Sequence, residues 1–315
     1  MSGSGEQHRQ GHRHAQLAAW TNAGVNVALT LGKGGIGVAT GSRALIADAV
    51  HSAADVVGSV AVLIGLRIAR KPPDDDHPYG HGKAEIISSA VVAIALIGAA
   101  IQVGYQSVVA FFEPPLLPHA SAAWAAGLSV VIKEVLYQYN FRLGRRLHSK
   151  ALLASASDHR SDVYSSAAAL AGILLSLVGQ ATGHRWLLHM DALAGAFVAL
   201  LILKMGYDIA QESLQMLMDR VVEYKDLVPY QLVIEQVVGV EHIDSLRARD
   251  HGQYVIVDVK ISVDAQISVL AGHDIAAEVK RSLKHAHPRV HDVLVHVNPF
   301  FAEERQQEGA TENDG

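Results

Sequence analysis

Long apolar segments follow one another between about residues 15 and 210, and short polar stretches separate them. Each segment is close to the ~20 residues that a helix needs to cross ~30 Å of hydrocarbon. The pattern therefore predicts six membrane-spanning helices, an all-α bundle with both ends on one side of the membrane, at about 16–39, 44–66, 86–112, 119–141, 151–178 and 190–209.

The pattern changes from about residue 221, where shorter elements replace the long apolar segments. Segments whose apolar residues have helical spacing and segments in which apolar and polar residues alternate follow one another in the order α-β-β-α-β. This order predicts a small C-terminal α+β domain with an antiparallel or mixed sheet. Its elements are expected at 224–238, 245–250, 254–263, 269–285 and 290–297.

The remaining segments are polar. Residues 1–14 lack the apolar core of a cleavable signal, so we expect a disordered arm there. The six-helix domain would then span 15–210, a linker 211–220 and the α+β domain 221–300. An acidic, disordered tail would cover 301–315.

Composition narrows the possible functions. Only 18% of residues are charged, below the roughly 25% of an average soluble domain. The net charge of −5 argues against a nucleic-acid partner, since no long basic run is present. The chain has no cysteine, so any metal site must use His, Asp and Glu.

Basic residues in the short loops predict the orientation, because cytoplasmic loops carry the excess of Lys and Arg. The loops after the second and fourth helices are basic, whereas the opposite loops carry only Arg43 and Arg185. Both termini are therefore expected in the cytosol. The basic loops contain Arg67, Arg70, Lys71, Lys83, Arg142, Arg145, Arg146 and Lys150.

Ionisable residues occur in two of the expected membrane helices. His51 and Asp55 lie four residues apart in the second helix, and Asp158 and Asp162 have the same spacing in the fifth. A charge at mid-bilayer costs about 2.5–3.5 kcal/mol on insertion scales, so such groups indicate a function. At 1.5 Å per residue both pairs lie ~20 Å from the cytosolic ends of their helices. One imidazole and three carboxylates could thus bind a divalent first-row metal.

Other readings stay open for these and neighbouring residues. The four groups could instead be polar contacts between helices. Asp48 could support the site or be solvated at the outer mouth, and Lys33 could reach outward or pair internally. His159 and Arg160 are expected off the Asp158/Asp162 face, as partners for other helices or lipid.

Three motifs resemble signatures of the cation diffusion facilitator family of metal transporters: GSRALIADAVHSAADVVGS, PPDDDHPYGHGKAE and SDHRSDVYSS. The resemblance extends over about residues 15–300. It implies a homodimer in a lipid bilayer, with six helices per subunit and a metallochaperone-like cytosolic domain. It also implies exchange of divalent transition metals for protons.

By position, the resemblance makes His51, Asp55, Asp158 and Asp162 the transport site. The zinc-selective branch usually has His where this chain has Asp158. Three oxygen donors suit Mn²⁺ or Fe²⁺ better than a two-His site would, although Zn²⁺ remains possible.

The resemblance implies further sites outside the membrane. Asp74, His77 and His81, in the loop after the second helix, match a second metal site of some members. The alternative is a solvated acidic loop that attracts cations. Lys83 and Asp219 match a salt bridge that links the membrane part to the cytosolic domain.

The cytosolic binuclear site of the family is built mostly from histidines. Only two of the matching places here hold His, so we expect at most a weaker regulatory site using Asp258, His273 and His296. The other histidines of this domain, His251 among them, are expected at the surface. The matching places are Asp244, Asp258, His273, His296 and Asn298.

The expected function is therefore a proton-coupled antiporter that exports Mn²⁺, Fe²⁺ or Zn²⁺ from the cytosol. It would be a multi-pass protein of a prokaryotic inner membrane. A membrane metal sensor or scaffold that does not transport is the alternative. An enzyme is not expected, because no HExxH motif is present and four protein ligands leave no position for a water nucleophile.

Overall fold

The computed structural model describes residues 3–147, 150–252 and 254–301. These residues form two units: a helical unit of residues up to 63 and 89–210, and a second unit of residues 64–88 and those from 211 onward. The expected disordered tail lies outside the described residues except for Phe301, as do residues 1 and 2 of the expected arm.

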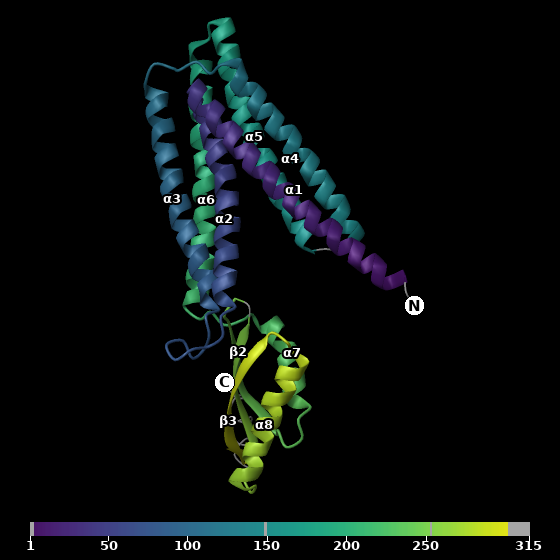
Figure 1. Cartoon of the computed structure of the whole chain (residues 1–315). Coiled ribbons are helices and arrows are strands. Elements are labelled where there is room, and N and C mark those ends of the chain that lie inside the picture. The colour runs from purple at the N-terminus through teal and green to yellow at the C-terminus, as the bar shows by residue number, and fades with distance from the viewer. Residues whose placement is uncertain (1–2, 148–149, 253, 302–315) are drawn as a thin grey trace, which may run out of the picture. The chain divides into compact units, whose positions relative to one another are not determined.

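Six long helices form in the expected order (Figure 1). Among the described residues, five helical segments are long and apolar enough to cross a membrane, and α1 adds the sixth helix of the bundle. A short 3-10 helix, η1 (Arg185–His189), precedes the last long helix. The long helices are α1 (Gly3–Thr40), α2 (Arg43–Ala69), α3 (Lys83–Phe112), α4 (Ala120–Leu147), α5 (Lys150–Thr182) and α6 (Met190–Leu217).

Two expectations about the flanks of the bundle are corrected. Residues 3–14, expected as a disordered arm, are the first turns of α1. The Glu, Gln and Arg residues of this segment favour a helix, although its three glycines oppose it. Most of the expected linker 211–220 is also helical, because α6 continues to Leu217 through the helix-forming stretch QESLQML.

Small side chains set the packing of α2 at the centre of the helical unit. Ala44 and Leu45 pack with alanines of α4 and with Ile173 of α5, whereas Ala47 packs with α3 and α6. Alanines let helix backbones approach closely, as is typical of membrane bundles.

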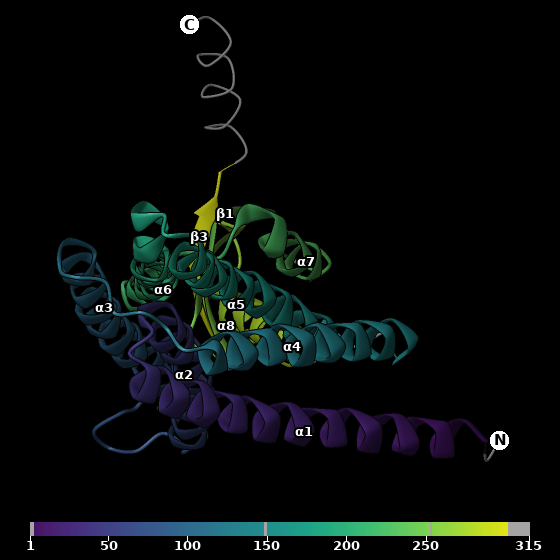
Figure 2. The same ribbon diagram turned by 90° about the horizontal axis from the view of Figure 1, so that it is seen from above.

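In both views α4 and α5 run side by side (Figures 1 and 2).

The start of α2 is fixed by a side chain from α6. Gly41 takes a positive φ of 70° between α1 and α2. Asp191 then accepts hydrogen bonds from Ser42 Oγ at 2.6 Å and from the Arg43 backbone N–H at 2.7 Å. These bonds satisfy a backbone donor that the first helical turn would leave without a partner.

The C-terminal part has the predicted α-β-β-α-β order, and its three-stranded sheet is mixed. The central strand β2 pairs antiparallel with β1 and parallel with β3. Buried side chains of β2 form one core with apolar residues of both helices, such as Ile234 and Leu283. The elements are α7 (Tyr224–Glu235), β1 (His242–Asp250), β2 (Val255–Asp264), α8 (Val269–Ala286) and β3 (Val290–Phe300).

Candidate metal centre

The two pairs of ionisable residues in the membrane helices lie at the same level of the bundle. His51 Nε2 on α2 is 3.6 Å from Asp162 Oδ1 on α5, and both side chains are buried. Asp55 of α2 lines the same cavity as Asp158 and Asp162 of α5. The equal depth of the two pairs, predicted from the rise per residue of a helix, therefore agrees with the structure.

A cavity of about 450 Å³ reaches three of these residues: Asp55, Asp158 and Asp162. It continues past Ser59, one turn after Asp55 on α2, and past Ser155, one turn before Asp158 on α5. The cavity therefore extends from the carboxylates toward the side of the loop between α2 and α3. Within the described part of the chain, the four residues do not bring three ligand atoms to within 4.8 Å of one another.

Lys133 of α4 is a member of this site that the sequence analysis missed. Its Nζ atom donates hydrogen bonds to Asp162 Oδ2 at 2.5 Å and to Asn26 Oδ1 at 2.8 Å, and the side chain is fully buried. One signal could have identified it. Placing a lysine in the middle of a membrane helix costs as much free energy as placing an aspartate there, so a buried partner is expected.

His159 also lies closer to the site than expected. Its Nδ1 atom is 3.7 Å from Asp162 Oδ2, and the ring is buried, so the expectation that it points away from this face is wrong. The reason is geometric, since residues three apart on a helix are neighbours. Arg160 behaves as expected: it reaches Glu134 of α4 at 2.7 Å.

A second buried network lies one turn beyond His51, on the side away from the cavity. Asp48 accepts hydrogen bonds from Lys33 Nζ at 2.9 Å and from the hydroxyls of Ser165 and Ser166. Asp48 has 0% exposure, which excludes the solvated outer mouth that its position in the sequence left open. Lys33, the other residue left undecided, pairs internally.

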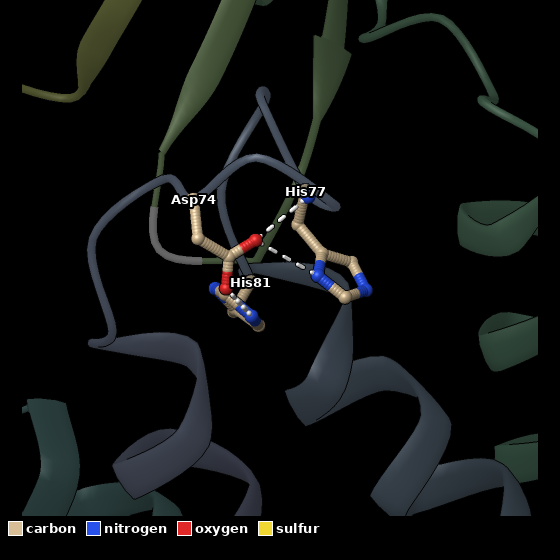
Figure 3. Close-up of side chains that lie close together, drawn as sticks. All are labelled: Asp74, His77 and His81. Carbon is tan, nitrogen blue, oxygen red and sulfur yellow. Dashed lines mark hydrogen bonds and ion pairs between the residues drawn. The ribbon is translucent and has the colours of Figure 1, made fainter.

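The loop between α2 and α3 brings Asp74, His77 and His81 together (Figure 3). Asp74 Oδ1 lies 3.1 Å from His77 Nδ1, and Asp74 Oδ2 lies 3.3 Å from His81 Nε2. One ligand atom from each residue falls within 4.8 Å of the others, a group that could hold a metal ion. The backbone N–H of His77 donates to Asp74, and this bond is the main cause that lowers the pKa of the Asp74 carboxyl.

Tyr254, which directly precedes β2, holds the end of this loop. Its hydroxyl donates to the Tyr79 carbonyl oxygen at 2.5 Å and accepts from the Gly82 N–H at 3.3 Å. The close approach requires glycine at 82, because a Cβ there would lie 2.4 Å from the backbone oxygen of His251.

Lys83 and Asp219 form the ion pair that the resemblance implies, at 2.9 Å. The hydrogen bond from Lys83 lowers the pKa of Asp219. His251, expected at the surface, is 8% exposed and lies 3.9 Å from Asp219. Burial, followed by the charge of Lys83, lowers the pKa of its imidazole.

The expected regulatory site of the α+β domain does not assemble in the described residues. Asp258 is occupied by an ion pair with Arg249, while His273 and His296 are exposed. Asp244 accepts hydrogen bonds from Ser262 Oγ at 2.8 Å and Asn298 Nδ2 at 2.9 Å. Both carboxylates thus have partners within the domain other than the histidines.

Comparison with known proteins gives the family. The cation efflux transmembrane domain matches residues 19–218, and the cation efflux protein cytoplasmic domain matches residues 223–300. The manganese efflux system protein MneP of Bacillus subtilis (strain 168) is 43% identical over 88% of this chain and 94% of its own length. MneS of the same organism, also a manganese efflux system protein, is 37% identical over 84% of this chain and 89% of its own length.

Relatives beyond these two include the magnetosome protein MamB of Magnetospira sp. (strain QH-2), 32% identical over 89% of this chain and 94% of its own length. The solved structure MamM-CTD 215-293 is 25% identical over 25% of this chain and 100% of that chain, with a TM-score of 0.24. The two family models together cover both parts of the chain. The chain belongs to the cation diffusion facilitator family of metal cation efflux proteins and is a multi-pass membrane protein.

Proposed function

We propose that this chain exports Mn²⁺ from the cytosol in exchange for protons, through a transport site formed by His51, Asp55, Asp158 and Asp162. The observation that carries the proposal is the set of donors from α2 and α5: three carboxylates line the cavity, and the imidazole of His51 lies 3.6 Å from one of them, Asp162. Oxygen-rich sites suit Mn²⁺, and two relatives carry manganese efflux in their names. Fe²⁺ and Zn²⁺ are the competing substrates.

The cavity supports a carrier that opens to one side at a time. It connects the carboxylates to the side of the α2–α3 loop, which the basic residues assign to the cytosol. On the other side, the buried Lys33, Asp48 and serine network leaves no continuation of the cavity in the described residues. This arrangement suits metal entry from the cytosol, and export then requires the helices to open on the opposite side.

Proton exchange follows from the chemistry of the donors. Carboxylates and imidazole bind metal only in their deprotonated forms, so metal and protons compete for the same atoms. A higher proton concentration outside the cell would release the metal there and return a protonated carrier. We further propose that the protein acts as a homodimer in the inner membrane, in keeping with its match to the family's cytoplasmic domain.

The test is Mn²⁺ uptake into everted membrane vesicles or proteoliposomes with an imposed pH gradient. Asp162→Ala should abolish gradient-driven uptake. Asp208→Ala is the matched control, because Asp208 of α6 is exposed and lies outside the cavity. Full uptake by Asp162→Ala would overturn the site, and uptake independent of the pH gradient would overturn proton exchange. Competition among Mn²⁺, Fe²⁺, Zn²⁺ and Co²⁺ in the same assay identifies the preferred substrate.

A further inference from the structure

Lys133 occupies one of the atoms that a transported metal would need. Its ammonium lies 2.5 Å from Asp162 Oδ2, while the other oxygen of that carboxylate is 3.6 Å from His51. The lysine is 0% exposed and comes from α4, a helix that supplies none of the proposed ligands. A positive charge is thus already bound at the most deeply buried of the three cavity carboxylates.

We propose that Lys133 is a tethered competitor of the metal: it occupies Asp162 in the empty carrier and must leave that carboxylate when a divalent cation binds. This inference rests on the transport site proposed above. An ammonium and a divalent ion on the same carboxylate repel each other, and the repulsion is strong here because Asp162 is only 4% exposed. Lys133 therefore weakens the binding of the metal and speeds its release.

The structure also contains a place for the displaced ammonium. Asn26 Oδ1 on α1 already accepts a hydrogen bond from Lys133 at 2.8 Å. One turn away on the same helix, Asn22 Oδ1 is buried and has no hydrogen-bond partner among the described residues. A rotation of the lysine side chain from Asp162 toward α1 would keep the hydrogen bond to Asn26 and could replace the carboxylate with the Asn22 oxygen. The ammonium would thus keep hydrogen bonds while a metal occupies Asp162.

The Lys33–Asp48 pair differs from this arrangement. Asp48 is held by Lys33 and by two serines, lies away from the cavity lining, and is not among the proposed ligands. Its lysine therefore neutralises a fixed charge. Lys133 instead neutralises Asp162, a carboxylate that is also a proposed metal ligand.

The experiment measures Mn²⁺ binding to the full chain in nanodiscs by calorimetry at constant pH. All variants carry Asp74→Ala, His77→Ala and His81→Ala, so that the loop group contributes no signal. Lys133→Met should bind Mn²⁺ at least about tenfold more tightly, because the competing charge is gone, and should transport it more slowly. Lys133→Arg, which keeps the charge, should bind within a few-fold of the parent protein.

The control is Lys204→Met. Lys204 also lies 2.5 Å from an aspartate, Asp208, but on the exposed side of α6. This substitution should leave Mn²⁺ affinity unchanged. If Lys133→Met does not fold, Lys133→Gln removes the charge and keeps a hydrogen-bond donor for Asp162. A residue with a purely structural role would weaken metal binding when replaced, so the direction of the change separates the two roles.

Two results would overturn the inference: unchanged or weaker Mn²⁺ binding by the uncharged variants, or tighter binding by Lys204→Met as well. Asp162→Ala in the same background separates this failure from that of the proposed function. If Asp162→Ala abolishes binding while Lys133→Met has no effect, the transport site stands and only the role of Lys133 is wrong. If Asp162→Ala binds Mn²⁺ normally, the transport site itself is wrong.

Discussion

The Nζ atom of Lys83, the first residue of α3, lies 2.9 Å from Oδ1 of Asp219, just after α6. Asp219 has a left-handed backbone with φ of 57°, a conformation that Asp and Asn tolerate better than most residues. The ion pair therefore fixes a turn whose backbone already limits the choice of residue. This geometry makes Asn the suitable replacement for testing the charge alone.

Asp219→Asn should lower the free energy of unfolding by about 0.2–1 kcal/mol at neutral pH, the usual range for an exposed pair. The modest size reflects solvent screening, since the two side chains are 32% and 41% exposed. Thermal unfolding of Asp219→Asn, Lys83→Met and the double variant gives the coupling energy. Strictly additive effects would show that the pair contributes nothing.

The same pair predicts a pH dependence. The hydrogen bond from Lys83 lowers the pKa of Asp219 in the folded protein, whereas an unfolded aspartate titrates near ~3.9. The stabilisation is thus complete above that unfolded value and is lost as the pH falls through the lowered folded pKa. The difference in melting temperature between the parent protein and Asp219→Asn should be constant from pH 5 to 7 and shrink below about pH 4. A difference that grows on acidification would contradict this sign.

The buried pair of Lys33 and Asp48 should have a larger effect on stability. Lys33→Met leaves a buried carboxylate without its counter-charge, which typically costs about 3–5 kcal/mol. Adding Asp48→Asn removes the stranded charge and should recover most of the loss. Denaturant unfolding in detergent measures both changes, with Lys204→Met as the exposed control. Equal destabilisation by the single and double variants would argue against the ion pair as the cause.

Asp158→His should change which metal is preferred. The substitution replaces one of three carboxylates at the cavity with imidazole, and a second nitrogen donor favours Zn²⁺ relative to Mn²⁺. We expect the ratio of Mn²⁺ to Zn²⁺ transport in proteoliposomes to fall by about tenfold or more, which corresponds to ~1.4 kcal/mol. Asp208→His provides a control for the added imidazole, because that position lies outside the cavity. An unchanged ratio would exclude Asp158 as a ligand that sets specificity.

The loop group of Asp74, His77 and His81 should bind metal independently of transport. Replacing all three with alanine should remove one bound Zn²⁺ or Mn²⁺ per chain in calorimetry, because the three ligand atoms lie within 4.8 Å of one another. Gradient-driven uptake should retain a measurable rate, since the group is separate from the cavity residues. Asp75→Ala with Asp76→Ala, which changes the neighbouring acidic residues, is the matched control. Equal loss of binding in that control would favour a diffuse acidic loop.

The sequence predicted the fold because each element had a local signal. Six apolar segments and the alternating strands around β2 needed no knowledge of tertiary contacts. The depth of Asp55 and Asp162 followed from the rise per residue of a helix. The position of Lys133 within an apolar helix was a local signal of a buried partner, but the identity of its partners, Asp162 and Asn26, was not predictable because they come from two other helices. His159 lies on this face because residues three apart on a helix are neighbours, as residues four apart are.

The contacts of Tyr254 have an energetic consequence for the loop that carries Asp74, His77 and His81. A free loop must lose backbone entropy, about 1–2 kcal/mol per ordered residue, before its ligands can converge on an ion. Here the Tyr254 hydroxyl fixes Tyr79 and Gly82 during folding. The ordering cost at these positions is thus met before any ion arrives, which preorganises the ligands. We therefore expect the α+β domain to raise the metal affinity of the loop without contributing a ligand atom of its own.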